Sequence, residues 1–157
     1  MRHLEDTSPA KTTPVVYVPM RGQYDCMTCV TAMLLGISYE DVETAFGGNI
    51  DPSKDKKEES QRLYWAYERL IQKHNRGALN YLNDTQLKEG RRYWVSVSID
   101  DPTNPLSKEM SHTILVDESG KVFDPNPQYG VFKSFAEWSA AMTLRHEIEL
   151  VQELYEY

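Results

Sequence analysis

Cysteine, clustered positive charge and long apolar runs are scarce in this sequence of 157 residues. Its two cysteines are more typical of free thiols in a cytoplasmic protein than of a structural disulfide. Lysine and arginine number 17 against 24 acidic residues, and the net charge of −7 argues against a broad surface for nucleic acid or anionic membrane. No apolar stretch approaches the roughly 18 residues of a membrane-spanning helix, and the N-terminus lacks the apolar core of a signal peptide. We therefore predict a cytoplasmic protein that binds neither nucleic acid nor membrane.

The rest of the composition is that of one globular domain. A chain of 157 residues buries roughly two thirds of its unfolded surface, so folding needs neither a metal nor a disulfide. The apolar fraction of 40% is a little low, but seventeen aromatic residues supply bulky core material. We predict a flexible N-terminal tail over residues 1–14, which have no apolar periodicity, and a single domain over residues 15–157 with no bound cofactor.

Cys26 stands at the start of an apolar run with helical spacing, which predicts a helix over residues 25–35. Four residues of the run share one stripe of this helix: Cys29, Val30, Met33 and Leu34. A thiol at a helix N-terminus lies beside unpaired N–H groups and the positive end of the helix dipole, and both favour the thiolate. Cys26 is therefore a candidate nucleophile.

Two more helices are predicted in the first half of the chain. Ser38 and Asp41 have the spacing of a capping box at the start of the second helix. Residues 58–75 return to helical spacing and predict the third helix. Residues 15–18 form a short β-branched run that predicts an edge strand, and residues 78–88 predict a short helical or irregular segment.

The hydrophobic period changes from 3.6 to 2 in the second half of the chain. Alternation predicts strands over residues 93–99 and 112–116 and, after a tight turn, over residues 121–124. Residues 134–142 open with a capping box and predict a short helix. Residues 146–157 fit either a helix or a strand, and we favour a closing strand. Helices followed by a largely antiparallel sheet, without an internal repeat, predict an α+β fold.

Three reactive residue types occur at the ends of these predicted elements: Cys26 at a helix start, His112 at the head of a strand and Asp124 at the end of the next strand. Because Gly120 predicts a tight hairpin, we expect His112 and Asp124 to be directly opposed or nearly so, with Cβ atoms about 5 Å apart. Thiol catalysis needs a base within hydrogen-bond reach of the sulfur and a third group that orients the base. The three residues fit those roles.

With these residues, the sequence resembles the papain-like cysteine peptidases, in particular the compact bacterial and phage members related to bacteriocin-leader-processing peptidases. The resemblance extends from about Val15 to Gly130. The segments that carry it are Asp25-Cys26, residues 32–36 and 39–42, residues 112–117, and Val122-Phe-Asp-Pro-Asn-Pro127. The resemblance implies a papain-like fold, in which the helix bearing the nucleophile packs on a mostly antiparallel sheet.

The resemblance also implies roles for single residues. Cys26 corresponds to the nucleophile, His112 to the general base and acid, and Asp124 to the orienting third member. Two positions depart from the family pattern: Met27 follows the nucleophile where the family has glycine, and Met20 stands where the family has the glutamine of the oxyanion hole. Gln23, three residues before Cys26, is the nearest side-chain amide that could take that role.

The function predicted from this pattern is that of a thiol-dependent hydrolase or acyl transferase, with a protein or peptide as substrate. Cleavage of peptide and isopeptide bonds, glutamine deamidation and transamidation share a thioester step, so the sequence does not separate them. A different class of function, a binding protein with the same fold and an inactive triad, is favoured by Met27 and by the displaced Gln23.

Two further hypotheses concern the cysteines. Cys26 and Cys29 have the C-x-x-C spacing of thiol–disulfide oxidoreductases. Asp25 stands where an aromatic residue usually precedes the first cysteine, and the next sixty residues read as helical, without the strand of a βαβ unit. A zinc site is not predicted, because the four histidines show no paired spacing.

Overall fold

The computed structural model describes residues 14–82, 87–88, 90–103 and 111–156. Apart from Pro14, the predicted N-terminal tail lies outside the described residues. No helix within the described ranges is long and apolar enough to cross a membrane.

Three helices come first, as predicted: α1 (Cys26–Leu35), α2 (Tyr39–Phe46) and α3 (Lys56–Lys73). The Ser38 hydroxyl accepts a hydrogen bond from the Asp41 N–H at 3.1 Å, which confirms the predicted N-cap of α2. Helix α3 begins two residues before the predicted start because the Asp55 carboxylate caps it, accepting from the Glu58 N–H at 2.9 Å.

Six strands follow and form one sheet: β1 (Arg76–Leu82), β2 (Arg92–Asp100), β3 (His112–Val116), β4 (Val122–Asp124), β5 (Gly130–Phe132) and β6 (Arg145–Glu156). Their order across the sheet is β1-β6-β2-β3-β4-β5, and every neighbouring pair is antiparallel. Helix α4 (Phe135–Ala141) lies between β5 and β6 in the chain. The fold is α+β, with N-terminal helices packed on a six-stranded antiparallel sheet.

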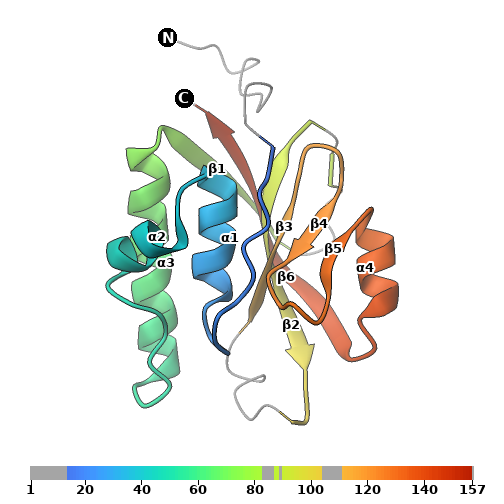
Figure 1. Cartoon of the computed structure of the whole chain (residues 1–157), viewed down its shortest axis with the longest axis horizontal. Coiled ribbons are helices and arrows are strands. Elements are labelled where there is room, and N and C mark those ends of the chain that lie inside the picture. The colour runs from blue at the N-terminus through green and yellow to red at the C-terminus, as the bar shows by residue number, and fades with distance from the viewer. Residues whose placement is uncertain (1–13, 83–86, 89, 104–110, 157) are drawn as a thin grey trace.

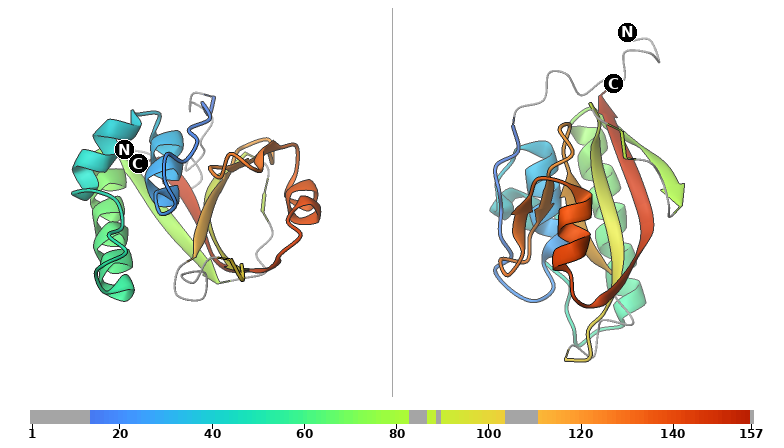
Figure 2. Two further views of the ribbon diagram at one scale, coloured as in Figure 1. Left: turned by 60° about the horizontal axis from the view of Figure 1, so that its bottom comes forward. Right: turned by 90° about the vertical axis from the view of Figure 1, so that its right-hand side faces the viewer.

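The helices cover the two faces of the sheet unequally. Helices α1, α2 and α3 lie together on one side of the curved sheet, and α4 lies on the other side beside β5 (Figures 1 and 2). Two cores result. The first joins the three N-terminal helices to the sheet through Val30, Tyr67, Trp94 and Leu115, among others. The second lies under α4 and includes Trp138, Val95, Ile114, Val122 and Val151.

Residues 78–88 were predicted to be helical or irregular. This prediction was wrong for residues 78–82, which belong to strand β1 (Arg76–Leu82). Asn75 adopts a left-handed backbone with φ of 59°, which turns the chain out of α3. Gly77 then pairs with Tyr155 of β6, and a Cβ atom at Gly77 would come within 2.4 Å of the Tyr155 ring. The strand state comes from a partner at the other end of the chain.

The edge strand predicted over Val15–Val18 was also wrong, because these residues form no strand. They run alongside the sheet, where the Tyr17 hydroxyl donates to the Asp124 carbonyl oxygen at 2.6 Å. Strand β5 was not predicted, because Pro125 and Gly130 read as the end of strand structure. The closing strand is β6, as favoured.

Candidate active site

Cys26 is the first residue of α1 and is partly exposed. The residue before it, Asp25, occupies the N-cap position but makes no side-chain cap to the helix. Its carbonyl oxygen accepts from the Cys29 N–H at 3.1 Å, the first backbone bond of the helix. The thiol therefore lies at a helix N-terminus whose first N–H groups receive no carboxylate from Asp25, and the helix dipole favours negative charge there.

His112 and Asp124 are in contact and lie nearly, but not directly, opposite each other across the hairpin. The β3–β4 ladder pairs Leu115 with Phe123, so in this register Asp124 faces Ile114 and His112 lies two residues further along β3. The side chains meet diagonally: His112 Nε2 lies 2.7 Å from Asp124 Oδ1. Diagonal neighbours on one face of an antiparallel pair are within reach of long side chains.

Cys26 joins this pair through the imidazole. A hydrogen bond links the thiol to His112, and because Nε2 meets Asp124, Nδ1 is the ring nitrogen left for the sulfur. The structure thus brings together the three residues that the sequence singled out, from α1, β3 and β4.

The pKa shifts of Cys26 and His112 favour the charged forms of both side chains. Burial raises the pKa of the Cys26 thiol. The hydrogen bond from His112, the positive charge of His112 and the hydrogen bonds from Thr113 lower it by more in total, so that the net shift is downward. Burial lowers the pKa of His112, whereas hydrogen bonds to Asp124 and Cys26 raise it to a net value of about 10. Both shifts favour a thiolate beside an imidazolium, the state in which cysteine is nucleophilic.

The Asp124 carboxylate is fully buried and has three donors around its two oxygens. Oδ1 accepts from His112 and from the Asn126 N–H at 2.9 Å, and Oδ2 accepts from the indole Nε1 of Trp138 at 2.8 Å. Trp138 lies in the helix that the sequence predicts over residues 134–142, but the sequence did not indicate this contact, since only the return of α4 over the sheet brings the indole to β4.

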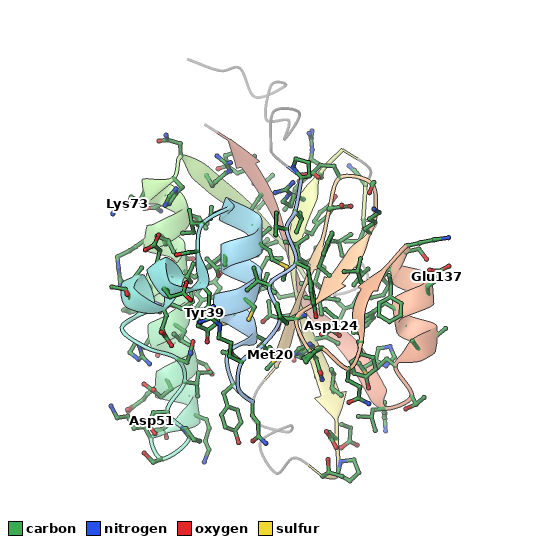
Figure 3. All side chains as sticks on the ribbon, in the orientation of Figure 1. Met20, Tyr39, Asp51, Lys73, Asp124 and Glu137 are labelled. Atoms are coloured by element: carbon green, nitrogen blue, oxygen red, sulfur yellow. The ribbon has the colours of Figure 1, made fainter. Side chains whose placement is uncertain are left out.

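The loop before Cys26 is hydrogen-bonded to the segment that follows Asp124. The Met20 N–H donates to the Pro125 carbonyl oxygen at 2.7 Å, next to Asp124 in the chain. Figure 3 labels Met20, Tyr39 and Asp124 around the end of α1 where the helix begins. Gln23 is exposed in this loop and borders the same groove as Cys26 and His112.

A groove of about 920 Å³ opens over Cys26 and His112. The α3 side of it consists of Lys57, Ser60, Gln61, Tyr64 and Trp65. The turn between β4 and β5 and the segment after α4 supply Asn126, Gln128, Tyr129 and residues 142–144. Sheet residues in the groove include Trp94, Ser96, Thr113 and Leu150. The groove therefore runs across the sheet, with Cys26 and His112 among its lining residues.

A β-bulge adds Glu149 to this groove. In the β2–β6 ladder, Ser96 pairs with Leu150 and Val97 pairs with Ile148, which leaves Glu149 as an extra residue. The Ser111 hydroxyl, next to His112, donates to Glu149 Oε1 at 2.5 Å. The bulge could not be predicted from the sequence, because residues 146–157 alternate imperfectly.

The second cysteine differs sharply from the first. Cys29 is completely buried within α1, and burial together with the charge of Asp25 raises the pKa of its thiol strongly. Both thiols are free. In the ranges that the structure describes, no three His, Cys, Asp or Glu side chains are grouped so that they could hold a metal ion.

Comparisons with known proteins leave the site to be interpreted from its own geometry: no protein-family model matches this chain, and no curated protein matches its sequence.

Proposed function

We propose that this protein is a thiol-dependent hydrolase or acyl transferase with a papain-like fold, acting on a peptide, isopeptide or glutamine amide bond of a protein or peptide. The observation that carries the proposal is the alignment of Cys26, His112 and Asp124. His112 Nε2 lies 2.7 Å from Asp124 Oδ1, and the Cys26 thiol is hydrogen-bonded to the same imidazole ring. A nucleophile, a base and an orienting carboxylate in this arrangement are what acyl transfer requires.

The reaction follows from these positions. The Cys26 thiolate attacks the carbonyl carbon and forms a tetrahedral oxyanion, and the His112 imidazolium gives its proton to the leaving amine as the C–N bond breaks. The resulting thioester is attacked by water, or by an amine in a transferase, while neutral His112 accepts the proton of the attacking group. Asp124 holds the imidazole in one orientation through both steps.

Two donors are available for the oxyanion. The Cys26 N–H belongs to the first turn of α1, where backbone N–H groups have no partner within the helix. The Gln23 side chain borders the same groove and is the amide that we assign as the second donor. Met20, which stands where the family has its glutamine, also borders the groove but offers no side-chain N–H.

The groove fits a chain-like substrate. Its volume of about 920 Å³ lies at the upper end for a small-molecule site, and it continues on both sides of the triad from α3 to the segment after α4. Its lining includes apolar residues such as Tyr64, Trp94 and Leu150 and polar ones such as Gln61, Ser96 and Gln128. That mixture suits a peptide backbone with side chains on either side.

The same structure argues against thiol–disulfide exchange as the main activity. Exchange needs a resolving thiol that can reach the mixed disulfide, and Cys29 is completely buried with a strongly raised thiol pKa. An inactive binding protein is the remaining alternative, and Met27 and the displaced Gln23 are the features that favour it. For such a protein, partner binding persists in Cys26→Ala and the wild type turns over no acyl probe.

A mass-spectrometric search for acyl adducts tests the proposal. The protein is exposed to p-nitrophenyl acetate and to a panel of peptide amides, then digested and searched for acylated cysteine. We expect acylation at Cys26, loss of it in His112→Ala, and its retention in the matched control Cys29→Ala. Acyl probes that leave Cys26 unmodified, although iodoacetamide reaches it, would exclude the hydrolase and support the binding protein.

A further inference from the structure

The Asp25 carboxylate points back into the preceding loop instead of forward onto α1. It is buried, with 3% of its surface exposed. Oδ2 accepts from the Arg21 N–H at 2.8 Å, and Oδ1 accepts from the Gly22 N–H at 3.3 Å. A third donor, the Tyr39 hydroxyl of α2, lies 2.8 Å from Oδ2. The Asp25 carboxylate therefore holds the loop that carries Gln23 in one closed conformation next to Cys26.

A second layer of contacts holds this arrangement against α2. The Asn49 amide donates to the Tyr39 hydroxyl at 2.9 Å, and the Thr28 hydroxyl on the first turn of α1 donates to Asn49 Oδ1. The Arg21 guanidinium stacks 3.9 Å from the centre of the Tyr39 ring and pairs with Glu40 at 2.6 Å. The loop is thus joined to α1 and α2 through the buried polar groups of Asp25, Tyr39 and Thr28, with an exposed Arg21–Glu40 ion pair outside them. A buried polar network of this kind fixes a single conformation.

The orientation of Asp25 has a second consequence. Aspartate at an N-cap normally accepts a hydrogen bond from the second or third N–H of its helix. Here both oxygens face donors outside α1, so the N–H groups of the first turn are left for a ligand at the groove. One residue thereby shapes the loop of Gln23 and leaves the Cys26 N–H uncapped.

We propose that Asp25 is the positioning residue of the oxyanion site: its carboxylate holds residues 21–24 so that Gln23 and the Cys26 N–H converge on one point. This inference rests on the proposed acyl-transfer function. Asp25 touches neither the substrate nor the reacting atoms and acts through the loop. Its removal disturbs the stabilisation of the oxyanion and leaves the nucleophile in place.

Two reactions of the same thiol separate these effects. Iodoacetamide alkylates Cys26 by forming a C–S bond at a saturated carbon as iodide leaves, and no oxyanion arises. p-Nitrophenyl acetate acylates it: the C–S bond forms at the carbonyl carbon, a tetrahedral oxyanion follows, and p-nitrophenolate leaves as its C–O bond breaks. Only the second reaction uses the oxyanion site.

We expect Asp25→Ala to lower the acylation rate by about 10- to 100-fold and to change alkylation at pH 7 by less than about threefold, since one donor of such a site is worth up to roughly 10³-fold. Asp25→Asn keeps one acceptor oxygen and should lose less. Tyr39→Phe removes a single donor to the same carboxylate and should lower acylation by about two- to tenfold. The matched control Asp55→Asn, which removes the carboxylate cap of α3, should leave both rates unchanged.

The outcomes are distinct. Equal losses of acylation and alkylation, or no loss of acylation in any folded Asp25 or Tyr39 variant, would overturn the positioning role alone. A wild type that is alkylated at Cys26 but never acylated would overturn the proposed function and this inference together. If Asp25→Ala does not fold, Asp25→Asn and Tyr39→Phe decide the question, with folding of each checked by circular dichroism.

Discussion

The indole of Trp138 donates to Asp124 Oδ2 at 2.8 Å, and His112 uses the other oxygen of the same carboxylate. Both Trp138 and Asp124 are fully buried. The Trp138 indole thereby holds the Asp124 carboxylate in place, and the carboxylate in turn orients the His112 imidazole. Trp138 belongs to α4, so this helix contributes to the geometry of a site whose nucleophile lies on the opposite side of the sheet.

Trp138→Phe tests this relationship. The variant keeps a ring in the core but removes the donor, so one oxygen of a buried carboxylate loses its partner. We expect a loss of about 2–3 kcal/mol in the free energy of unfolding, since an unsatisfied buried polar group costs about 1–3 kcal/mol and the smaller ring adds to it. Denaturant titration measures the loss. The control Trp65→Phe, at a side chain that is 57% exposed, should change stability by less than about 0.5 kcal/mol. Equal losses in both variants would contradict the role of the indole N–H.

The sequence was informative where a single element decides the structure. The start of α1 at Cys26 follows from local spacing, and the strands that begin with His112 and end with Asp124 follow from alternation and the turn at Gly120. These three facts are enough to bring the triad together. The diagonal register did not follow from the sequence, because it depends on the length of the turn: Val116 pairs with Val122, and residues 117–121 form the connection.

The sequence was uninformative where a distant partner decides the structure. Strand β1 exists because β6 pairs with it, and its own residues, Gly77 and Asn80 among them, give no strand pattern. Trp138 reads as an ordinary core residue until α4 packs over the sheet. Asp25 stands at the start of the helix predicted over residues 25–35, and only the structure shows that its carboxylate faces Tyr39 and the loop N–H groups.

Cys26 and Cys29 should differ in their rate of alkylation. Cys26 is partly exposed with a lowered thiol pKa, whereas Cys29 is fully buried with a raised one. Because the thiolate is the reactive form, we expect iodoacetamide at pH 6–7 to modify Cys26 at least about 100-fold faster. Peptide mapping over a time course gives both rates. Similar rates would remove the nucleophile assignment, and a reversible disulfide between the two at a cytosolic potential would favour the redox hypothesis.

The pH dependence of that alkylation should report the coupling to His112. In the wild type the rate rises as pH increases through the lowered pKa of Cys26 and then stays level, because His112 keeps its proton up to a pKa of about 10. In His112→Ala the hydrogen bond and the charge that lower the thiol pKa are lost while burial still raises it, so the midpoint moves to higher pH. Rates measured from pH 5 to 10 locate the midpoints.

Asp124→Asn should produce a smaller shift than His112→Ala. The hydrogen bond to Asp124 is the largest contribution that raises the pKa of His112, so the variant lowers that pKa. The pH range in which the imidazolium and the thiolate are present together becomes narrower. The imidazole remains, although its tautomer and orientation are less well fixed. Identical pH–rate profiles in the wild type and both variants would mean that the three residues are not coupled.

Gln23 is the last assignment to test, and it separates binding from catalysis. The Cys26 N–H supplies one donor to the oxyanion, and Gln23 is the exposed amide that borders the same groove. We expect Gln23→Ala to lower turnover of an acyl probe by about 10²- to 10³-fold, roughly the cost of losing one such donor. The Michaelis constant should change little, because the contact strengthens only in the transition state. Gln23→Glu should be as slow or slower, since a carboxylate repels the oxyanion, while alkylation of Cys26 continues in both variants. Full turnover in Gln23→Ala would leave Cys26 as the nucleophile and assign the second donor to the backbone N–H of residue 23 or 24, in the loop that Asp25 holds in place.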